Sequence, residues 1–305
     1  MITFSKLEKK GNLGNQLFHI ASTIGIAKKN GQPYAFPSWR LEEFFDYTFP
    51  KAPENNNFKY IKEKQFHFYE WELQDMDYDI EGWLQSEKYF DIPFTRNTVF
   101  KFKESFIKPL LEEYEYLFDR KNILISVRRG DFIHHPFYFQ LSYRFYFTAL
   151  LEYFPDWEER NLIFISDDIA YCKFHFSHFP NAYFLEGLSP IEQLALGSRS
   201  DDYIISNSTF SWWVAWLGEK ENSKVVRPLS KFRGEKSTLS NEKDFFPDRW
   251  TIHDHRKKTI PSRYSKLYIK ANTYLLGRFI YNKLRGMKYR IIRLPKKIRL
   301  VFLVR

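Results

Sequence analysis

The sequence predicts an α/β protein of two domains, the second of which is built on a parallel β-sheet. Residues 162–228 alternate short apolar strands with helical segments, the pattern of a parallel sheet covered by helices. Residues 123–127 add an apolar strand that runs directly into charged residues. The length of 305 residues favours two domains over one, and we place them at 1–120 and 121–255, before a tail at 256–305.

The N-terminal segment has the order strand, loop, helix. Residues 2–7 alternate apolar and polar side chains, and residues 11–16 form a loop with two glycines. Residues 17–29 carry apolar side chains at helical spacing. Free backbone N–H groups and the helix dipole would face this loop, which makes it a potential anion site. A tight turn held by local hydrogen bonds is the alternative, because the spacing fits neither the dinucleotide fingerprint nor the Walker pattern.

The remainder of the first domain gives weaker signals. Residues 50–66 are polar, contain two prolines and predict a surface loop. Residues 79–90 are too mixed to assign to an element. Residues 106–118 alternate apolar and acidic side chains at helical spacing and predict a helix just before the domain boundary at 119–121.

Two adjacent arginines follow the strand at 123–127. Arg128 and Arg129 would lie at the carboxyl end of the sheet, where ligands bind in open α/β folds, and Gly130 allows a sharp turn before Asp131. Guanidinium groups present fixed donors that match phosphate oxygens, so the pair predicts a diphosphate clamp. An Arg–Asp pair that only holds the turn together is the alternative.

The same arrangement recurs at the next strand. Residues 141–153 predict a helix, and residues 162–166 an apolar strand that ends in Ser166, Asp167 and Asp168 before a helix from residue 169. Ser166 and Asp167 would cap that helix in the absence of a nucleotide. With a nucleotide bound, the carboxylates would accept hydrogen bonds from ribose hydroxyl or base N–H groups.

A polar junction follows a third strand. A helix at 190–197 and a strand at 203–206 lead into residues 207–211, which offer hydroxyl and amide groups to a phosphate at a helix N-terminus. A capping cluster is the alternative. The nearby tryptophans, which we expect to pack rather than to stack on sugars, are Trp212, Trp213 and Trp216. Residues 225–228 predict a last short strand.

Cysteine content and hydropathy bound the setting of the protein. Cys172 is the only cysteine, which excludes an internal disulfide framework and a cysteine-rich metal site. The first ten residues lack the apolar core of a signal peptide. No uncharged apolar run approaches the roughly 20 residues that span a bilayer. We therefore expect a cytoplasmic protein.

The positive charge is concentrated in the tail. The net charge is +10, and residues 256–305 hold 16 Lys or Arg and no acidic residue, which leaves −6 for residues 1–255. Apolar positions at helical spacing lie between these cations, as in segments that rest in a membrane interface. We expect the tail to bind an anionic membrane, at the inner face of the plasma membrane. Packing on the acidic body and nucleic-acid binding are the alternatives, and we expect no nucleic acid.

Five motifs resemble the α-1,2-fucosyltransferases of glycosyltransferase family 11 in their bacterial form. The family's Gly-Gly-Leu-Gly-Asn-Gln-Met-Phe loop resembles residues 11–18, and its His-x-Arg-Arg-Gly-Asp motif resembles residues 126–131. Its Gly-Tyr-x-Gln-Ser-Glu-Lys-Tyr-Phe, Phe-Ser-Asp-Asp and Asn-Ser-Ser/Thr-Phe-Ser-Trp-Trp-Gly-Ala-Trp-Leu segments resemble residues 82–90, 165–168 and 207–217. The last of these motifs is highly specific, and the tail lies outside the match.

The resemblance implies a fold, a reaction and a set of site residues. It implies a GT-B-like fold of two Rossmann-like domains facing across a cleft, and inverting transfer of fucose from GDP-fucose without an essential metal or other cofactor. The acceptor would be O2 of a terminal galactose in an oligosaccharide or lipid-linked glycan, as in lipopolysaccharide O-antigen biosynthesis. Arg128 would stabilise the leaving group and Asp131 is the candidate general base. The donor-binding residues would be Gly14, Asn15, Gln16, Arg128, Arg129, Asp167, Asn207, Ser208, Thr209, Phe210 and Ser211.

The sequence departs from the family at several positions. Ser126 replaces the motif histidine, Asn12 and Val214 replace glycines, and Arg144-Phe145 interrupts a usual tyrosine pair. These changes would alter the acceptor pocket while leaving donor binding intact. A transferase with another linkage or another sugar nucleotide is one alternative. A membrane-tethered binder of a sugar nucleotide without activity is the other, and the loss of the histidine favours it.

Overall fold

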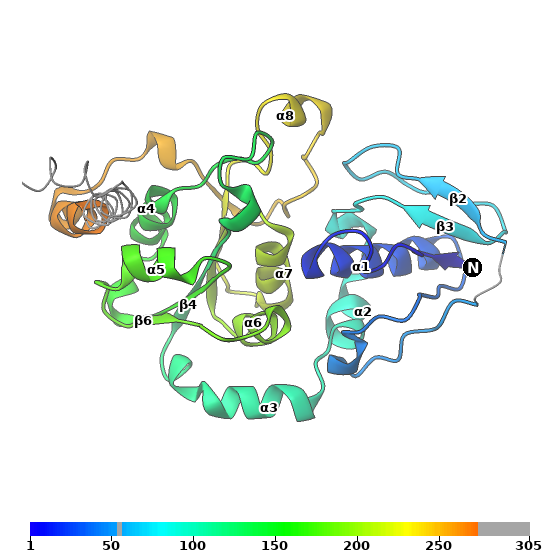
Figure 1. The fold of residues 1–305 in the computed structure, drawn as a ribbon, viewed down its shortest axis with the longest axis horizontal. Coiled ribbons are helices and arrows are strands. Elements are labelled where there is room, and N and C mark those ends of the chain that lie inside the picture. The colour runs from blue at the N-terminus through cyan, green and yellow to red at the C-terminus, as the bar shows by residue number, and fades with distance from the viewer. Residues whose placement is uncertain (54–56, 274–305) are drawn as a thin grey trace, which may run out of the picture.

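Two parallel sheets organise the chain, and the computed structural model describes residues 1–53 and 57–273 (Figure 1). The first sheet has the order β1-β3-β2, and the second has the order β6-β5-β4-β7-β8-β9. All strand pairs in both sheets are parallel. The strands are β1 (Ile2–Thr3), β2 (Lys59–Lys62), β3 (Tyr78–Glu81), β4 (Asn122–Val127), β5 (Asn161–Ser166), β6 (Ala182–Phe184), β7 (Asp202–Ile205), β8 (Val225–Pro228) and β9 (Thr251–His253).

Helices connect and cover these strands. Figure 1 shows α3 running beneath the molecule, from the half that holds the first sheet (the first half) to the half that holds the second sheet (the second half). The helices are α1 (Leu13–Lys29), α2 (Ile92–Phe94), α3 (Glu104–Glu113), α4 (Tyr143–Tyr153), α5 (Ile169–Phe176), α6 (Pro190–Gly197), α7 (Thr209–Gly218) and α8 (Glu235–Leu239). Residues 265–273 are also helical. Short 3-10 or π turns cover Glu42–Phe44, Glu87–Tyr89, Thr95–Val99, Glu115–Leu117, Gly130–Phe132, Trp157–Glu159, His255–Lys257 and Ser262–Tyr264.

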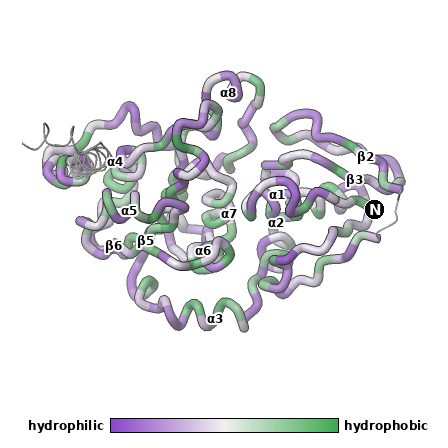
Figure 2. The backbone as a smooth tube through the Cα atoms, in the orientation of Figure 1, coloured by the Kyte–Doolittle hydropathy of each residue, from purple (hydrophilic) through white to green (hydrophobic). Residues whose placement is uncertain are grey.

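The predicted α/β class with parallel sheets is confirmed. The structure differs from the prediction at strands whose sequences give little apolar signal. Part of the predicted loop at 50–66 is the edge strand β2, whose side chains are mostly exposed and which Figure 2 colours as largely hydrophilic. An edge strand exposed on both faces has no apolar alternation, so the pattern could not reveal it. Residues 225–228 form β8, but this is not the last strand as predicted, because β9 follows after a long connection and pairs with β8. β3 lies partly in the unassigned segment 79–90.

One hydrophobic core runs through both halves. Phe18 of α1 lies 4.6 Å from Trp212 and 5.1 Å from Trp213 of α7, measured between ring centroids. Phe90, from the first half, stacks on Trp213 at 5.3 Å and meets Trp216 edge-on at 5.3 Å. All three tryptophans are fully buried, so the prediction that they pack in the core is confirmed.

Replacing Trp213 with alanine is expected to lower the free energy of unfolding by about 3–5 kcal/mol, because it leaves a cavity between the two halves. Denaturant unfolding followed by circular dichroism measures the change. The control is Tyr60→Ala, an aromatic truncation at a side chain that is 50% exposed, with an expected cost below about 1 kcal/mol. Equal costs for the two variants would contradict the assignment of Trp213 to a shared core.

The described part of the tail packs on the second half. Ala271 is fully buried, and Tyr268 lies 5.5 Å from Tyr143 and 5.3 Å from Phe147 of α4. Over residues 264–271 the apolar face therefore contacts the body, which was the alternative to a membrane. Residues 274–305, which carry the rest of the predicted membrane segment, lie outside the described residues. Among the described helices, none has the length and apolar content needed to cross a membrane.

Candidate functional site

A cleft of about 550 Å³ lies between the two halves. Its walls come from the loop and first turn of α1, the ends of β4 and β5, the first turn of α7 and the segment around α8. Ligands bind at the carboxyl ends of strands in open α/β sheets, and both β4 and β5 end here. The predicted site residues that line the cleft are Gly14, Asn15, Gln16, Arg128, Asp131, Asp167, Ser208, Thr209, Phe210 and Ser211.

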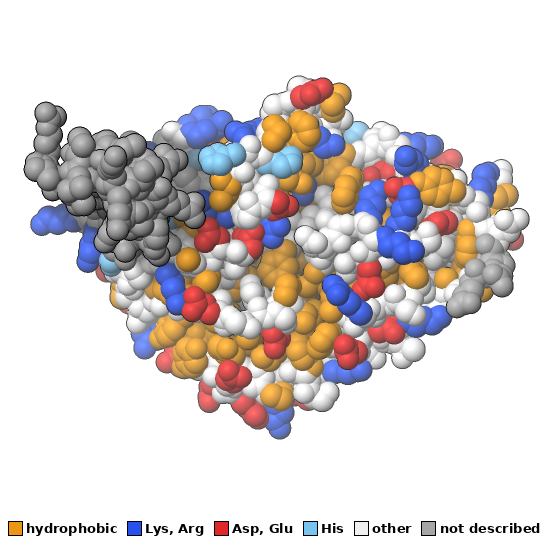
Figure 3. Space-filling view, viewed as in Figure 1, with side chains coloured by type: hydrophobic (Ala, Val, Ile, Leu, Met, Phe, Trp, Pro, Cys, Tyr) orange, Lys and Arg blue, Asp and Glu red, His pale blue; other side chains and the backbone are white. Residues whose placement is uncertain are grey.

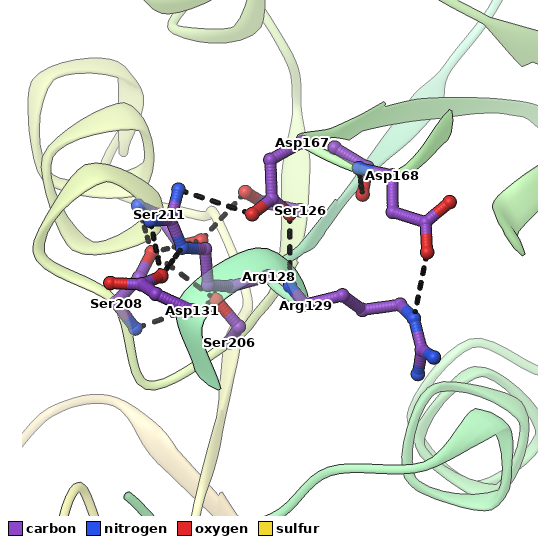
Figure 4. Close-up of polar contacts among 10 residues, drawn as sticks. Ser126, Arg128, Arg129, Asp131, Asp167, Asp168, Ser206, Ser208 and Ser211 are labelled. Atoms are coloured by element: carbon purple, nitrogen blue, oxygen red, sulfur yellow. Dashed lines mark hydrogen bonds and ion pairs between the residues drawn. The ribbon is translucent and has the colours of Figure 1, made fainter. Parts of the chain in front are cut away.

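Arg128 lies at the end of β4 between two carboxylates (Figure 4). Its Nη2 is 2.5 Å from Oδ1 of Asp131, and its Nη1 is 3.3 Å from Oδ2 of Asp167. The backbone N–H of Arg129 donates to Oδ1 of Asp167 at 2.9 Å. A Cβ at Gly130 would lie 2.4 Å from Oδ2 of Asp167, so a larger residue there would force the Asp167 carboxylate to shift. The Arg–Asp pair holds the turn and at the same time faces the cleft.

Arg129 points away from Arg128, as Figure 4 shows, and does not line the cleft. Its Nε donates to Oδ2 of Asp168 at 3.1 Å, and its guanidinium lies 3.6 Å from the centre of the Tyr171 ring. The structure therefore does not form a clamp from two adjacent arginines. The side chains of successive residues after a strand point in different directions, and the side chain of Arg129 lies beside α5.

The two aspartates after β5 have separate tasks. Asp168, and not Asp167, caps α5 by accepting a hydrogen bond from the backbone N–H of Tyr171 at 3.1 Å. The hydroxyl of Ser166 accepts one from the N–H of Asp168 at 2.9 Å. The expected capping role of Asp167 is thus wrong. Asp167 instead lies in the wall of the cleft beside Arg128.

Serine hydroxyls gather at the start of α7. Ser211 Oγ lies 2.7 Å from the hydroxyls of Ser126 and Ser206 and 2.9 Å from that of Ser208, as Figure 4 shows. Ser208 also caps the helix by accepting a hydrogen bond from the N–H of Ser211 at 3.0 Å. Ser126 is 2% exposed, so the residue at the place of the family histidine joins a buried hydroxyl network that borders the cleft.

Asn207 does not face the cleft, contrary to its predicted contact with the donor. Its Nδ2 donates to the backbone carbonyls of Phe139 at 3.0 Å and Lys231 at 2.8 Å, and the residue is 1% exposed. A buried amide is most stable with its donors satisfied, and the nearest acceptors here are in the backbone. Asn207 therefore fixes the segment around Lys231.

The first turn of α1, which begins at Leu13 inside the predicted loop 11–16, forms the opposite wall. Gln16 accepts a hydrogen bond from Trp39 Nε1 at 2.9 Å, and Asn15 accepts one from Gln85 Nε2 at 2.8 Å. A Cβ at Gly14 would lie 2.5 Å from the backbone of Thr209 and Phe210. The N-termini of α1 and α7 therefore meet at the cleft, and their free N–H groups and dipoles favour an anion there.

Lys231 lines the cleft and was not predicted from the sequence. It is 4% exposed, and burial lowers the pKa of its ammonium group to about 7, while Glu242 opposes the shift. Lys231 stands in the long connection between β8 and β9, where no periodicity or motif singles it out. Gln85, which also lines the cleft, does lie within the motif at 82–90.

Charged groups on the face in view are mixed, and no metal cluster is present in the described ranges. Figure 3 shows Lys and Arg side chains interspersed with Asp and Glu over the described surface of this face. Within residues 1–53 and 57–273, no three His, Cys, Asp or Glu side chains are grouped so that they could hold a metal ion.

Comparison with known proteins gives a family match and distant relatives. The family model described as glycosyl transferase family 11 matches residues 28–253, about three quarters of the chain. The O-antigen biosynthesis glycosyltransferase WbnK of Escherichia coli is 33% identical over 135 residues, 41% of this chain and 42% of that protein. The α-1,2-colitosyltransferase of Escherichia coli is 30% identical over 139 residues, 42% of this chain and 46% of that protein.

These two matches span less than half the length of the curated relatives. A putative galactoside 2-α-L-fucosyltransferase of Caenorhabditis elegans is 24% identical over 81% of this chain and 78% of its own length. Among solved structures, the fucosyltransferase NodZ from Bradyrhizobium is 13% identical. Its alignment covers 71% of this chain and 92% of that chain, with a TM-score of 0.49.

Proposed function

The chain belongs to glycosyltransferase family 11, and on that basis we propose that it is an inverting transferase that moves L-fucose from GDP-fucose to a glycan hydroxyl. The proposed acceptor is O2 of a terminal galactose in a cell-surface glycan precursor. The names of three relatives support this choice, since they include an O-antigen transferase and two α-1,2-linking or galactoside-specific transferases.

The observation that carries the proposal is the cleft where Arg128, Asp167 and the N-termini of α1 and α7 meet. In the proposed reaction the acceptor oxygen attacks C1 of fucose, and the bond from C1 to the diphosphate breaks. Negative charge then builds up on GDP, and donors that are already in place stabilise such charge most effectively. Arg128 and the two helix N-termini supply these donors.

Asp131 is the proposed acceptor of the proton from the attacking hydroxyl. Its side chain is 59% exposed and borders the cleft, so an acceptor sugar can reach it. Its hydrogen bond to Arg128 at 2.5 Å fixes one carboxylate oxygen and leaves the other for substrate. A general base must lie within hydrogen-bond reach of the proton that it takes.

Incubation with GDP-fucose and a panel of galactosides, followed by mass and linkage analysis, tests the proposal. We expect a fucosylated product with a new bond at O2 of galactose, and we expect turnover to persist in EDTA because protein donors replace a metal at the diphosphate. A product only with the colitose donor would favour the chemistry of the 30% identical relative. Binding of GDP-fucose without any product would identify an inactive binder.

The tail gives a separate proposal, that residues beyond 273 hold the protein on the anionic inner face of the plasma membrane. Residues 274–305 contain 10 Lys or Arg and no acidic residue. Each cation near an anionic leaflet contributes on the order of 1 kcal/mol, which suffices for surface binding without a span.

Truncation after residue 273 is expected to release the protein from vesicles that contain anionic lipid and to leave activity on soluble acceptors unchanged. The cut lies beyond Ala271, which packs in the core, so the fold should persist. Co-sedimentation with anionic and with neutral vesicles measures the effect. Equal sedimentation of the full and truncated chains would contradict a role for this segment.

A further inference from the structure

Lys231 places a buried amino group in the wall of the cleft, with no ion-pair partner among the described residues. It is 4% exposed, and its Nζ lies 3.7 Å from the centre of the Phe245 ring. Within residues 1–53 and 57–273 this nitrogen forms no ion pair, and the carboxylate that acts on it, Glu242, is bound to backbone N–H groups. Burying a charge in this way is costly unless a partner of opposite charge arrives.

The carboxylate that acts on the ammonium group of Lys231 is that of Glu242, and it is already hydrogen-bonded to the backbone. Glu242 accepts hydrogen bonds from the backbone N–H of Lys231 at 2.9 Å and from that of Phe232 at 2.8 Å. Both oxygens of Glu242 are therefore bound to the backbone of this segment. Glu242 thus holds the turn, and its carboxylate does not pair with the ammonium group of Lys231 in the cleft wall.

The backbone of Lys231 is fixed to the junction before α7. Its carbonyl accepts hydrogen bonds from Asn207 Nδ2 at 2.8 Å and from the N–H of Phe139 at 3.0 Å. Asn207 directly precedes Ser208, the N-cap of α7. The lysine is thus tied to the α7 N-terminus that borders the cleft, on a different element from Arg128.

We propose that Lys231 binds the diphosphate of the donor nucleotide through its ammonium group, as a second cation beside Arg128. This inference rests on the proposed function, because it takes a nucleoside diphosphate as the ligand. One cation at the end of β4 and one from the connection between β8 and β9 would hold a diphosphate from two directions, which one arginine at the end of β4 does not achieve. The bound anion also supplies the negative partner that the buried lysine lacks.

Binding of GDP and of guanosine to the Lys231→Met variant, measured by calorimetry, tests the inference. We expect about 10- to 100-fold weaker binding of GDP, the loss of one charge-assisted contact, and unchanged binding of guanosine. Lys231→Arg keeps the charge and should recover part of the GDP affinity. The control is Lys243→Met, the same change at an exposed lysine of the same connection, which should bind GDP like the wild type.

Proton uptake gives a second measurement that a structural role would not change. Burial lowers the pKa of Lys231 to about 7, so at pH 8 the free protein holds it mostly neutral. A bound diphosphate raises that pKa, and the wild type should then take up most of a proton, whereas Lys231→Met should not. The charged groups that share the cleft are Arg40, Arg128, Asp131, Asp167 and Lys236, with Glu242 behind the lysine.

The outcomes separate the inference from the function. If the wild type binds GDP and Lys231→Met binds it equally well, the inference is wrong and the proposed function stands. Equal losses for GDP and guanosine would show a structural role and also overturn it. If the wild type does not bind GDP at all, the proposed function itself fails.

Discussion

Replacing Arg128 with alanine is expected to lower kcat/KM for fucosyl transfer by about 10²-fold or more, the scale of removing one preorganised donor to a developing negative charge. Arg128 borders the cleft at the end of β4, where its guanidinium lies between Asp131 and Asp167. Steady-state rates with GDP-fucose and the best galactoside from the panel measure the loss. Arg128→Lys keeps the positive charge but loses the planar guanidinium, so its rate should fall between those of the wild type and Arg128→Ala.

The matched control is Arg129→Ala, which removes the neighbouring guanidinium. Arg129 pairs with Asp168 and lies over Tyr171, outside the cleft, so we expect less than a tenfold change in rate. Its main expected effect is a modest loss of stability. Similar rate losses for both alanine variants would restore the clamp of two arginines that the sequence predicted, and near-normal activity of Arg128→Ala would show that the leaving group lies elsewhere.

Gly14→Ala is expected to lower activity by about 10²-fold, because the new Cβ would lie 2.5 Å from the backbone of Thr209 and Phe210. The N-termini of α1 and α7 would have to move apart, and misplacement by about 1 Å at a reacting centre costs on that scale. Overpacking should also lower the free energy of unfolding by about 1–3 kcal/mol. Rates and thermal melting of the same preparation measure both effects.

Gly31→Ala provides the comparison for Gly14→Ala. Gly31 follows α1 at its far end, has a φ of +63° and has nothing within 4 Å of an added Cβ. Its alanine variant should lose about 1 kcal/mol or slightly more through backbone strain, with unchanged activity. Equal activity losses in the two variants would indicate general destabilisation and not displacement at the cleft.

The four central strands of the second sheet, β5, β4, β7 and β8, could be predicted because they are short, mostly buried and apolar, whereas the less buried edge strands β6 and β9 were not predicted. Residues 123–127 and 162–166 lie inside the strands β4 and β5, and α6 and β8 have the predicted bounds. A central strand covered on both faces needs apolar residues at every position, which gives a strong local signal. The exposed edge strand β2 carries no such signal.

The direction of site side chains could not be predicted in the same way. Adjacent residues such as Arg128 and Arg129 share one motif but take opposite sides, and the choice depends on Asp168 and Tyr171, which come from another part of the chain. Asn207 likewise turns to backbone carbonyls of distant segments. The backbone of Lys231 is held at the cleft by hydrogen bonds with Asn207 and Glu242, contacts that no sequence pattern predicts.

The ring cluster of Phe18, Phe90 and the three tryptophans limits how far the two halves can separate to admit the proposed nucleotide. Pulling the halves apart would hydrate five large side chains, each of which contributes roughly 1.5–3 kcal/mol or more by being out of water. Such a penalty at every turnover is incompatible with a clamshell cycle. Under the proposed function, we therefore expect GDP to enter and leave past the surface loops of a closed molecule, and we expect calorimetry to show one unfolding transition for both halves.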